Sequence, residues 1–341
     1  MSKRYTMFSG GEGSYRAAKI DRARHPDAEY GLVFTDLLYE DADTYRFLIE
    51  AAADVLGRRL NWTVDVDGAP DYRVSEDTPI EEYCGNPEWR AWLAETRERA
   101  VTALPELIWL VEGRDPWEIF RDGRFLGNSL VDPCSRVGKR EVADAWRMGH
   151  CFRSGELFGD ADHFAVGIGL HERHRFDDQL GGGLGPRMAA DGWNYHAPLI
   201  DAEEAINDGG TDHMALLFSP VDQLGVRGQR MYQQGYKHGN CGGFCIKAGQ
   251  AHWANRFRVQ PERFAYDAMM ERKLGAFIGK PVSMLTDRRG SSKKKPLTLD
   301  DFKRRLLARP NKKYEYQPGE SGCGCMTDAI APTPDQTNEQ P

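Results

Sequence analysis

The sequence predicts an α/β fold in which helices cover a doubly wound, mostly parallel sheet. An apolar run at residues 5–8 ends in a glycine-rich turn and passes directly into an Ala-rich helical segment that stops near Arg24. Further apolar runs at 30–34, 107–111 and 164–170 have the length and composition of buried parallel strands. Strands that alternate with helical segments indicate βαβ units rather than an antiparallel sheet.

The intervening segments fit this scheme. Apolar residues recur at helical spacing between 43 and 56, while 57–105 is polar and Pro-containing and is predicted to be an insertion between two strands. A strand-to-helix passage is expected at 193–206. Helices are predicted at 87–103, 117–125, 135–146, 261–280 and 299–307.

Composition and charge exclude several classes of protein. The chain has 341 residues, of which 40% are hydrophobic and 28% charged, as expected for a globular protein with a substantial core. No run of about 18 apolar residues occurs and no signal-peptide core precedes the first strand, so we expect a cytoplasmic protein without a membrane partner. The formal charge of −7 argues against a wholly basic nucleic-acid binder.

The glycine-rich turn is the first candidate site. Backbone N–H groups of such a turn point at one spot, and the helix N-terminus behind it adds roughly half a positive charge there. Phosphate is therefore the predicted ligand, and the alternative is an ordinary surface turn. The turn has neither the Walker lysine nor the GxGxxG spacing of a dinucleotide site. Its predicted ligand-binding residues are Ser9, Gly10, Gly11, Gly13 and Ser14.

Two more predicted strands end in polar residues. Thr35 and Asp36 follow the 30–34 strand, at the sheet edge where open α/β folds bind ligands. Asp36 is a candidate for a nucleotide's ribose or for a metal such as Mg²⁺, and the alternative is a helix cap. After the 164–170 strand, the planar guanidinium of Arg175 suits phosphate or sulfate, and the alternative is an ordinary exposed charge.

Cysteines form the second group of candidates. Cys134 lies beside Arg136 and Lys139 at a predicted helix start, a setting that favours a thiolate, although a small buried side chain is the alternative. Cys241 and Cys245 are separated by two glycines and one phenylalanine, so both sulfurs can face one point. With Cys134 as a third ligand and Cys323 or Cys325 as a fourth, they predict an iron–sulfur cluster; zinc or a redox dithiol are the alternatives.

A basic segment follows the last long helix. Residues 288–313, from Arg288 to Lys313, contain eleven Lys or Arg against Asp300 and Asp301. A solvated face is one interpretation, and contact with the phosphates of tRNA or DNA is the other.

In combination these stretches resemble the phosphoadenosine phosphosulfate (PAPS) reductase-like branch of the adenine nucleotide α-hydrolase, or PP-loop, superfamily, particularly its phage and bacterial members. The usual loop is SGGxDS, and Gly13 replaces the Asp. The resemblance is carried by SGGEGS, FTD, FLGNSLVDPCSRVGKR, GIGLHERHR and NCGGFCIKAGQAHW. It implies a Rossmann-like fold and, for Gly167, Glu172 and Arg175, a segment that closes over the nucleotide.

The resemblance also implies an activity. An adenine nucleotide, ATP or PAPS, would bind the glycine loop while Arg136, Lys139 and Arg175 neutralise its charge. The cysteines would then act on sulfur. They would reduce PAPS with a thioredoxin-like partner, or transfer sulfur from a donor to an ATP-activated base of a nucleic acid. A nucleotide-binding protein without catalysis is the remaining alternative.

The resemblance leads us to predict three regions. Residues 1–180 form the nucleotide-binding domain with the insertion at 57–105, residues 181–325 form a Cys-bearing helical region, and 326–341 are a disordered tail.

Overall fold

A five-stranded parallel sheet forms the centre of the molecule. The computed structural model describes residues 2–128, 131–155, 160–177, 183–287 and 295–316. The strand order is β3-β2-β1-β4-β5 and every neighbouring pair is parallel, which confirms the predicted α/β fold and is consistent with a Rossmann-like one. The strands are β1 (Arg4–Met7), β2 (Tyr30–Asp36), β3 (Leu107–Val111), β4 (His163–Val166) and β5 (Asn194–His196).

Different apolar clusters cover the two faces of the sheet, because side chains alternate along each strand. In β2, Leu32 and Phe34 belong to the larger cluster, whereas Val33 belongs to the other. Leu48 packs in the first cluster and Ala143 in the second. The result is a three-layer arrangement of helices, sheet and helices.

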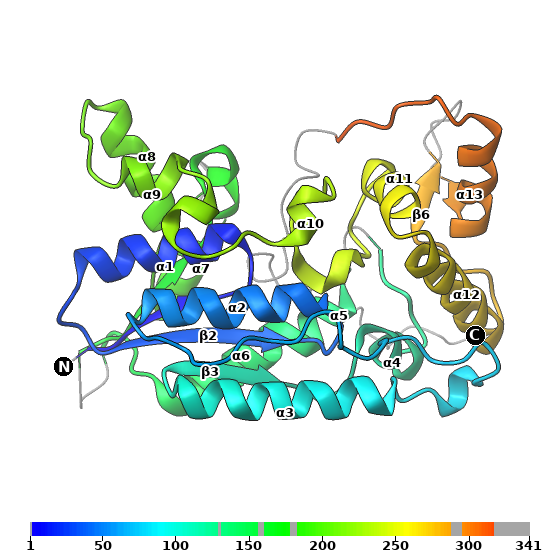
Figure 1. The fold of residues 1–341 in the computed structure, drawn as a ribbon, viewed down its shortest axis with the longest axis horizontal. Helices are drawn as coiled ribbons and strands as arrows, with labels where there is room; N and C mark the ends of the chain where they lie inside the picture. Colours follow the sequence, from blue (N-terminus) through cyan, green and yellow to red (C-terminus); the bar gives the residue numbers. More distant parts are fainter. Residues whose placement is uncertain (1, 129–130, 156–159, 178–182, 288–294, 317–341) are drawn as a thin grey trace, which may run out of the picture.

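Helices α1 (Glu12–Arg24), α2 (Ala42–Val55) and α3 (Pro87–Ala103) contribute to the larger cluster. Figure 1 shows α1 and α2 running along one side of β2. Helix α2 begins where the Asp41 side chain accepts a hydrogen bond from the Asp43 N–H, at 3.0 Å. Helix α3 spans the predicted range, and Trp89 and Leu93 bury it in the core.

The other face carries a helix with an irregular first turn. It follows helix α4 (Pro116–Asp122), which packs in the larger cluster through Trp117, Ile119 and Phe120 and starts with a capping box between Asp115 and Glu118. The helix predicted at 135–146 is built from α5 (Pro133–Ser135), the π-helical turn η2 (Arg136–Glu141) and α6 (Val142–His150). A π-turn shifts the side-chain register by one residue, and here Lys139 and Arg140 are both buried.

The remaining helices continue from β4 to the last described residues. Beyond β4 they include three short 3₁₀ helices in the described residues, and the antiparallel strands β6 and β7 lie before the last helix; one further 3₁₀ helix, η1, precedes α3. In chain order these elements are η1 (Ile80–Glu82), η3 (Leu170–Arg175), α7 (Leu184–Ala190), α8 (Pro198–Asn207), α9 (Met214–Phe218), η4 (Val221–Leu224), α10 (Arg230–Gln233), η5 (Asn240–Gly243), α11 (Gln250–Val259), α12 (Pro261–Ile278), β6 (Leu285–Asp287), β7 (Lys295–Leu297) and α13 (Leu299–Ala308).

The larger apolar cluster continues from the sheet into the C-terminal helices. Trp253, Phe264 and Phe302, on α11, α12 and α13, belong to the same cluster as Phe34 of β2. Strand β5 also lies beyond residue 180 while pairing with β4. The proposed boundary at residue 180 stays a prediction, and 326–341 lie outside the described residues.

No helix in the described ranges is long and apolar enough to span a membrane.

Candidate functional site

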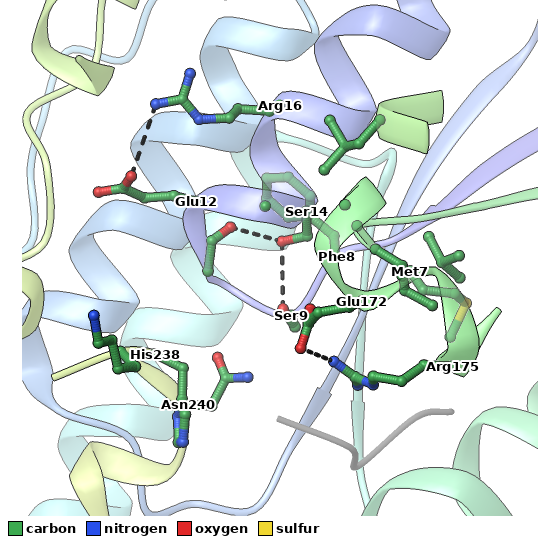
Figure 2. A pocket seen from close by; sticks show the side chains of 18 of the residues that line it. Met7, Phe8, Ser9, Glu12, Ser14, Arg16, Glu172, Arg175, His238 and Asn240 are labelled. Carbon is green, nitrogen blue, oxygen red and sulfur yellow. Dashed lines mark hydrogen bonds and ion pairs between the residues drawn. The ribbon is translucent and has the colours of Figure 1, made fainter. Parts of the chain in front are cut away.

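The glycine turn connects β1 to α1 as predicted. Gly10 has a φ of 76°, which a residue with a Cβ rarely adopts, and Gly11 is the N-cap of α1 in an extended conformation. The Ser14 hydroxyl donates to the Gly11 carbonyl at 2.8 Å and lies 3.4 Å from the Ser9 hydroxyl (Figure 2). The turn is therefore closed on itself. The first N–H groups of α1 have no intrahelical acceptor, and the first of them, that of Glu12, donates to the Tyr232 hydroxyl at 3.3 Å.

Gly13 is explained by a close backbone contact. A Cβ on Gly13 would lie 3.0 Å from the Gly167 carbonyl oxygen, and a Cβ on Gly167 would lie 2.5 Å from the Ser14 nitrogen. The loop and the end of β4 thus pack backbone against backbone. This contact also shortens the predicted 164–170 strand, since β4 ends at Val166.

A cavity of about 380 Å³ opens beside this turn. It lies at the carboxyl ends of the neighbouring strands β1 and β4. After β1 the chain continues to β2, on one side of this pair in the sheet, and after β4 it continues to β5, on the other side. In open α/β sheets this switch point is the usual ligand site. Nine predicted site residues line the cavity, namely Ser9, Gly11, Gly13, Ser14, Thr35, Lys139, Gly167, Glu172 and Arg175.

Four cationic and three carboxylate side chains line the same cavity: Arg16, Lys139, Arg175, Lys237, Glu12, Glu172 and Glu203. Several of these charges pair within the wall. Arg175 lies 2.7 Å from Glu172, and Arg16 lies 3.8 Å from Glu12 while donating to the Leu216 carbonyl (Figure 2). Burial raises the pKa of the Glu12 carboxyl, and Arg16 partly opposes this.

Lys139 connects the cavity to the cysteine loop. Its ammonium lies 3.5 Å from the Glu40 carboxylate and 3.5 Å from the Cys241 sulfur, and only 3% of the residue is exposed. Burial raises the pKa of Glu40 to about 7, and Lys139 opposes the shift. The Gly242 N–H also donates to Glu40, at 3.3 Å.

The cysteine loop has an unusual backbone. Cys241 has φ 54° and ψ 33°, and Gly242 repeats this left-handed conformation. A Cβ on Gly242 would lie 2.9 Å from the Tyr39 carbonyl oxygen. The two glycines of CGGFC therefore allow the loop to approach the main chain just before α2.

The structure brings the two cysteine stretches together without showing a metal centre. Besides the contact between Lys139 and Cys241, Lys247 lies 3.8 Å from Asp132. Cys134 and Cys241 are buried and Cys245 is partly exposed. Within the part of the chain that the structure describes, no group of three or more His, Cys, Asp or Glu side chains could hold a metal ion.

Three predicted ligand-binding residues do not line the cavity. Gly10 shapes the turn from behind, with its carbonyl bound by the Gln229 side chain. Arg136 lies 3.6 Å from Glu141. Asp36 is fully buried and accepts hydrogen bonds from Leu38 N–H at 2.8 Å, the Tyr45 hydroxyl at 2.8 Å and the Trp109 indole at 3.0 Å.

The structure adds a wall that the sequence interpretation missed. Tyr232, Lys237, His238 and Asn240 line the cavity, and Tyr232 and Asn240 lie beside Gly11 of the glycine turn. They precede Cys241 in the run YQQGYKHGNC, whose concentration of polar and aromatic residues was the available signal. Nothing local indicates that this run crosses a loop more than two hundred residues away in sequence.

Some predictions fall on residues that the structure does not describe. Cys323 and Cys325 lie beyond residue 316, and Arg288 and its neighbours to 294 are also outside the described ranges.

No protein-family model, curated protein or solved structure matches the chain. The chemistry of the cavity therefore has to be inferred from its own residues.

Proposed function

We propose that the chain is a PAPS reductase-like enzyme that binds an adenine nucleotide, ATP or PAPS, and carries out sulfur chemistry with cysteine thiols. One observation carries the proposal. The glycine turn and the N-terminus of α1 open into a cavity of about 380 Å³ at the switch point of a parallel sheet. A helix N-terminus, serine hydroxyls and nearby cations together suit a phosphate or sulfonate.

The cavity has a second, apolar part that suits a base. Val166, Ile168, Leu199 and Leu217 line it, from β4, the segment after it, α8 and α9. An adenine ring would lie against these side chains while the phosphates lie on Ser9, Gly11, Gly13 and Ser14. Lys139 and Arg175 would neutralise charge as a bond at the phosphate end is made or broken.

In sulfonucleotide reduction, a cysteine thiolate attacks the sulfonate sulfur of PAPS. An S–S bond forms and the S–O bond to the 5′-phosphate breaks, which releases adenosine 3′,5′-bisphosphate. A second thiol then displaces sulfite and leaves a disulfide, which a thioredoxin-like dithiol reduces. The predicted iron–sulfur cluster takes its fourth ligand from Cys323 or Cys325, which lie outside the described residues, so the cluster stays a prediction.

The C-terminal cysteines are the proposed nucleophile and its partner. Lys237 of the cavity wall has its ammonium 5.6 Å from the Tyr316 ring, at the end of the described chain. Figure 1 shows the stretch after α13 running across the molecule toward α10. Cys323 follows Tyr316 by seven residues, a span of roughly 25 Å when extended. This length supports delivery of Cys323 or Cys325 to the cavity.

A second candidate is ATP-dependent thiolation of a nucleic acid. It is favoured by the exposed cations on and after α13, which are Arg304, Arg309, Lys312 and Lys313. Such cations bind phosphates without reading sequence, and binding through them falls steeply with added salt.

Nucleotide binding is the first test. We expect the full chain to bind ATP or adenosine 3′,5′-bisphosphate, and Ser9→Ala or Ser14→Ala to weaken binding about 5- to 50-fold by removing a hydroxyl at the phosphate position. Ser75→Ala, at an exposed serine, is the matched control. A wild-type chain that binds neither nucleotide would rule the proposal out.

Turnover separates the candidates. Sulfite released from PAPS with a dithiol reductant, and lost in Cys323→Ala and Cys325→Ala variants that still bind nucleotide, supports reduction. Pyrophosphate released from ATP only with tRNA or DNA present supports thiolation. Nucleotide binding with neither product under anaerobic, reducing conditions would favour a non-catalytic binding protein.

A further inference from the structure

Hydrogen bonds hold the segment 229–240 against the glycine turn. The Tyr232 hydroxyl accepts from the Glu12 N–H at 3.3 Å, and the Gln229 side chain donates to the Gly10 carbonyl. From α2, the Thr44 hydroxyl donates to the Gly239 carbonyl at 3.2 Å. These contacts hold one face of the segment against the turn, so its side chains form a fixed wall of the cavity.

Two polar atoms on this wall are buried and unsatisfied. Within the described chain, Nδ1 of His238 and Oδ1 of Asn240 have no hydrogen-bond partner, and the two residues are only 9% and 6% exposed. Both residues line the cavity, and Figure 2 shows them on the side facing Ser9. Leaving a buried polar atom unpaired costs about 1–3 kcal/mol, which a ligand in the cavity would recover.

Both atoms lie near the phosphate end rather than the apolar end. Oδ1 of Asn240 is 3.7 Å from the position of a Cβ on Gly11, beside the helix N-terminus. The charged groups that act on His238 are Lys139 from η2 with Arg175 and Glu172 from η3. Its ring also stacks on His252 of α11, with centroids 5.4 Å apart.

These surroundings keep His238 uncharged when the cavity is empty. Burial, then Lys139 and Arg175, lowers its pKa to about 4, while Glu172 acts in the opposite direction. A neutral imidazole carries one donor and one acceptor, and the Asn240 amide carries both kinds. His238 with its proton on Nδ1 can therefore donate to an oxyanion, and Asn240 can donate from Nδ2 once its amide turns, because the unpaired Oδ1 itself only accepts.

We propose that His238 and Asn240 bind the oxyanion end of the nucleotide, beside the glycine turn. The ligand class is a nucleotide whose phosphate or sulfonate oxygens contact both the turn and segment 229–240. This inference rests on the proposed function, since it assumes a nucleotide in this cavity. It adds two ligand-contacting residues that were not expected from the sequence.

The test compares ligands that differ only at the phosphate end. Dissociation constants are measured for adenosine, AMP, ATP and adenosine 3′,5′-bisphosphate with the wild type, His238→Phe, His238→Asn and Asn240→Leu. We expect His238→Phe and Asn240→Leu to weaken the phosphate-bearing ligands about 10- to 100-fold and adenosine less than twofold. His238→Asn, whose amide keeps a hydrogen-bond donor at this position, should recover part of the loss. Exposed His174→Asn is the control.

The outcomes distinguish this inference from the proposed function. Wild-type protein that binds no nucleotide defeats both. If the wild type binds nucleotide and the variants lose affinity equally for adenosine and ATP, or lose none, the inference alone is overturned. His238 and Asn240 would then support the fold or contact the base. Preference for adenosine 3′,5′-bisphosphate over ATP in the wild type, lost in the variants, would identify a sulfonucleotide site.

Discussion

Gly13 occupies the position where the related loop pattern has an Asp, and its environment explains the exchange. It faces the main chain of Gly167, where an added Cβ would be 3.0 Å from a carbonyl oxygen. An Asp side chain in this backbone arrangement would displace β4 from the turn. Among the described residues, Glu12, Glu172 and Glu203 are the Glu side chains that line the cavity.

We expect Gly167→Ala to destabilise the protein by about 1–3 kcal/mol and to weaken nucleotide binding, because its Cβ would lie 2.5 Å from the Ser14 nitrogen. Gly149→Ala is the control, since a Cβ at this helical position meets nothing within 4 Å. Urea unfolding measures the first effect and ligand titration the second. Equal stability of the two variants would contradict the packing argument.

His238 makes a prediction about pH. An anion beside Nδ1 favours the imidazolium, so its pKa rises from about 4 on binding and the complex takes up a proton. Affinity should then increase as pH falls from about 8 toward about 5, roughly the range around the ordinary pKa of a histidine. The ratio of His238→Asn to wild-type dissociation constants should grow over the same range. A constant ratio would assign the pH dependence to the ligand's own phosphates.

At the scale of elements, the π-helical turn η2 decides which side chains reach the site. The sequence predicted a regular helix from 135, with Arg136 and Lys139 on its outer first turns. The extra residue of a π-turn rotates this segment, so that Lys139 is buried at the cavity between Glu40 and Cys241. Arg136 instead pairs with Glu141 on the same turn.

Helix α12 carries a buried carboxyl that couples stability to pH. Glu271 accepts from the Met284 N–H at 2.6 Å and the Leu299 N–H at 2.7 Å, and so connects α12 to β6 and α13. Burial raises its pKa from 4.5 to about 7, although these N–H groups oppose the shift. The folded state therefore holds a proton that the unfolded state releases between these two values.

Stability should fall as pH rises from 4.5 to 7 by up to roughly 3 kcal/mol from this group. Glu271→Gln should lack this component, while Glu262→Gln, an exposed position on the same helix, should retain it. Urea unfolding across this pH range is the measurement. Parallel curves for the wild type and Glu271→Gln would refute the assignment.

At the scale of the molecule, one apolar core joins the sheet to the C-terminal helices. Phe244 of the cysteine loop lies 5.1 Å from Trp117 and 5.5 Å from Tyr39, and Tyr266 of α12 lies 5.9 Å from Tyr72, measured between ring centroids. The cavity likewise takes walls from both sides of residue 180. Residues before and after 180 therefore form one core and one cavity together.

We expect a fragment of residues 1–180 not to fold alone, because it lacks β5 and leaves the aromatic face around Trp117 exposed. Circular dichroism and near-ultraviolet spectra of the fragment would test this against the full chain, which should unfold in one cooperative transition. A fragment with native-like near-ultraviolet signal and its own transition would support two independent domains.

Local signals were sufficient for the sheet, the glycine turn and the helix behind it, because strand and helix periodicities and glycine requirements are encoded within a few residues. The cavity's far wall was not predictable in this way. Asp36 turns inward to Tyr45 and Trp109, and Lys139 depends on a π-turn. Segment 229–240, which carries His238 and Asn240, is held at the site by hydrogen bonds from Gln229 to Gly10 and from Glu12 to Tyr232. Such placements result from packing between segments far apart in sequence, which only the tertiary structure specifies.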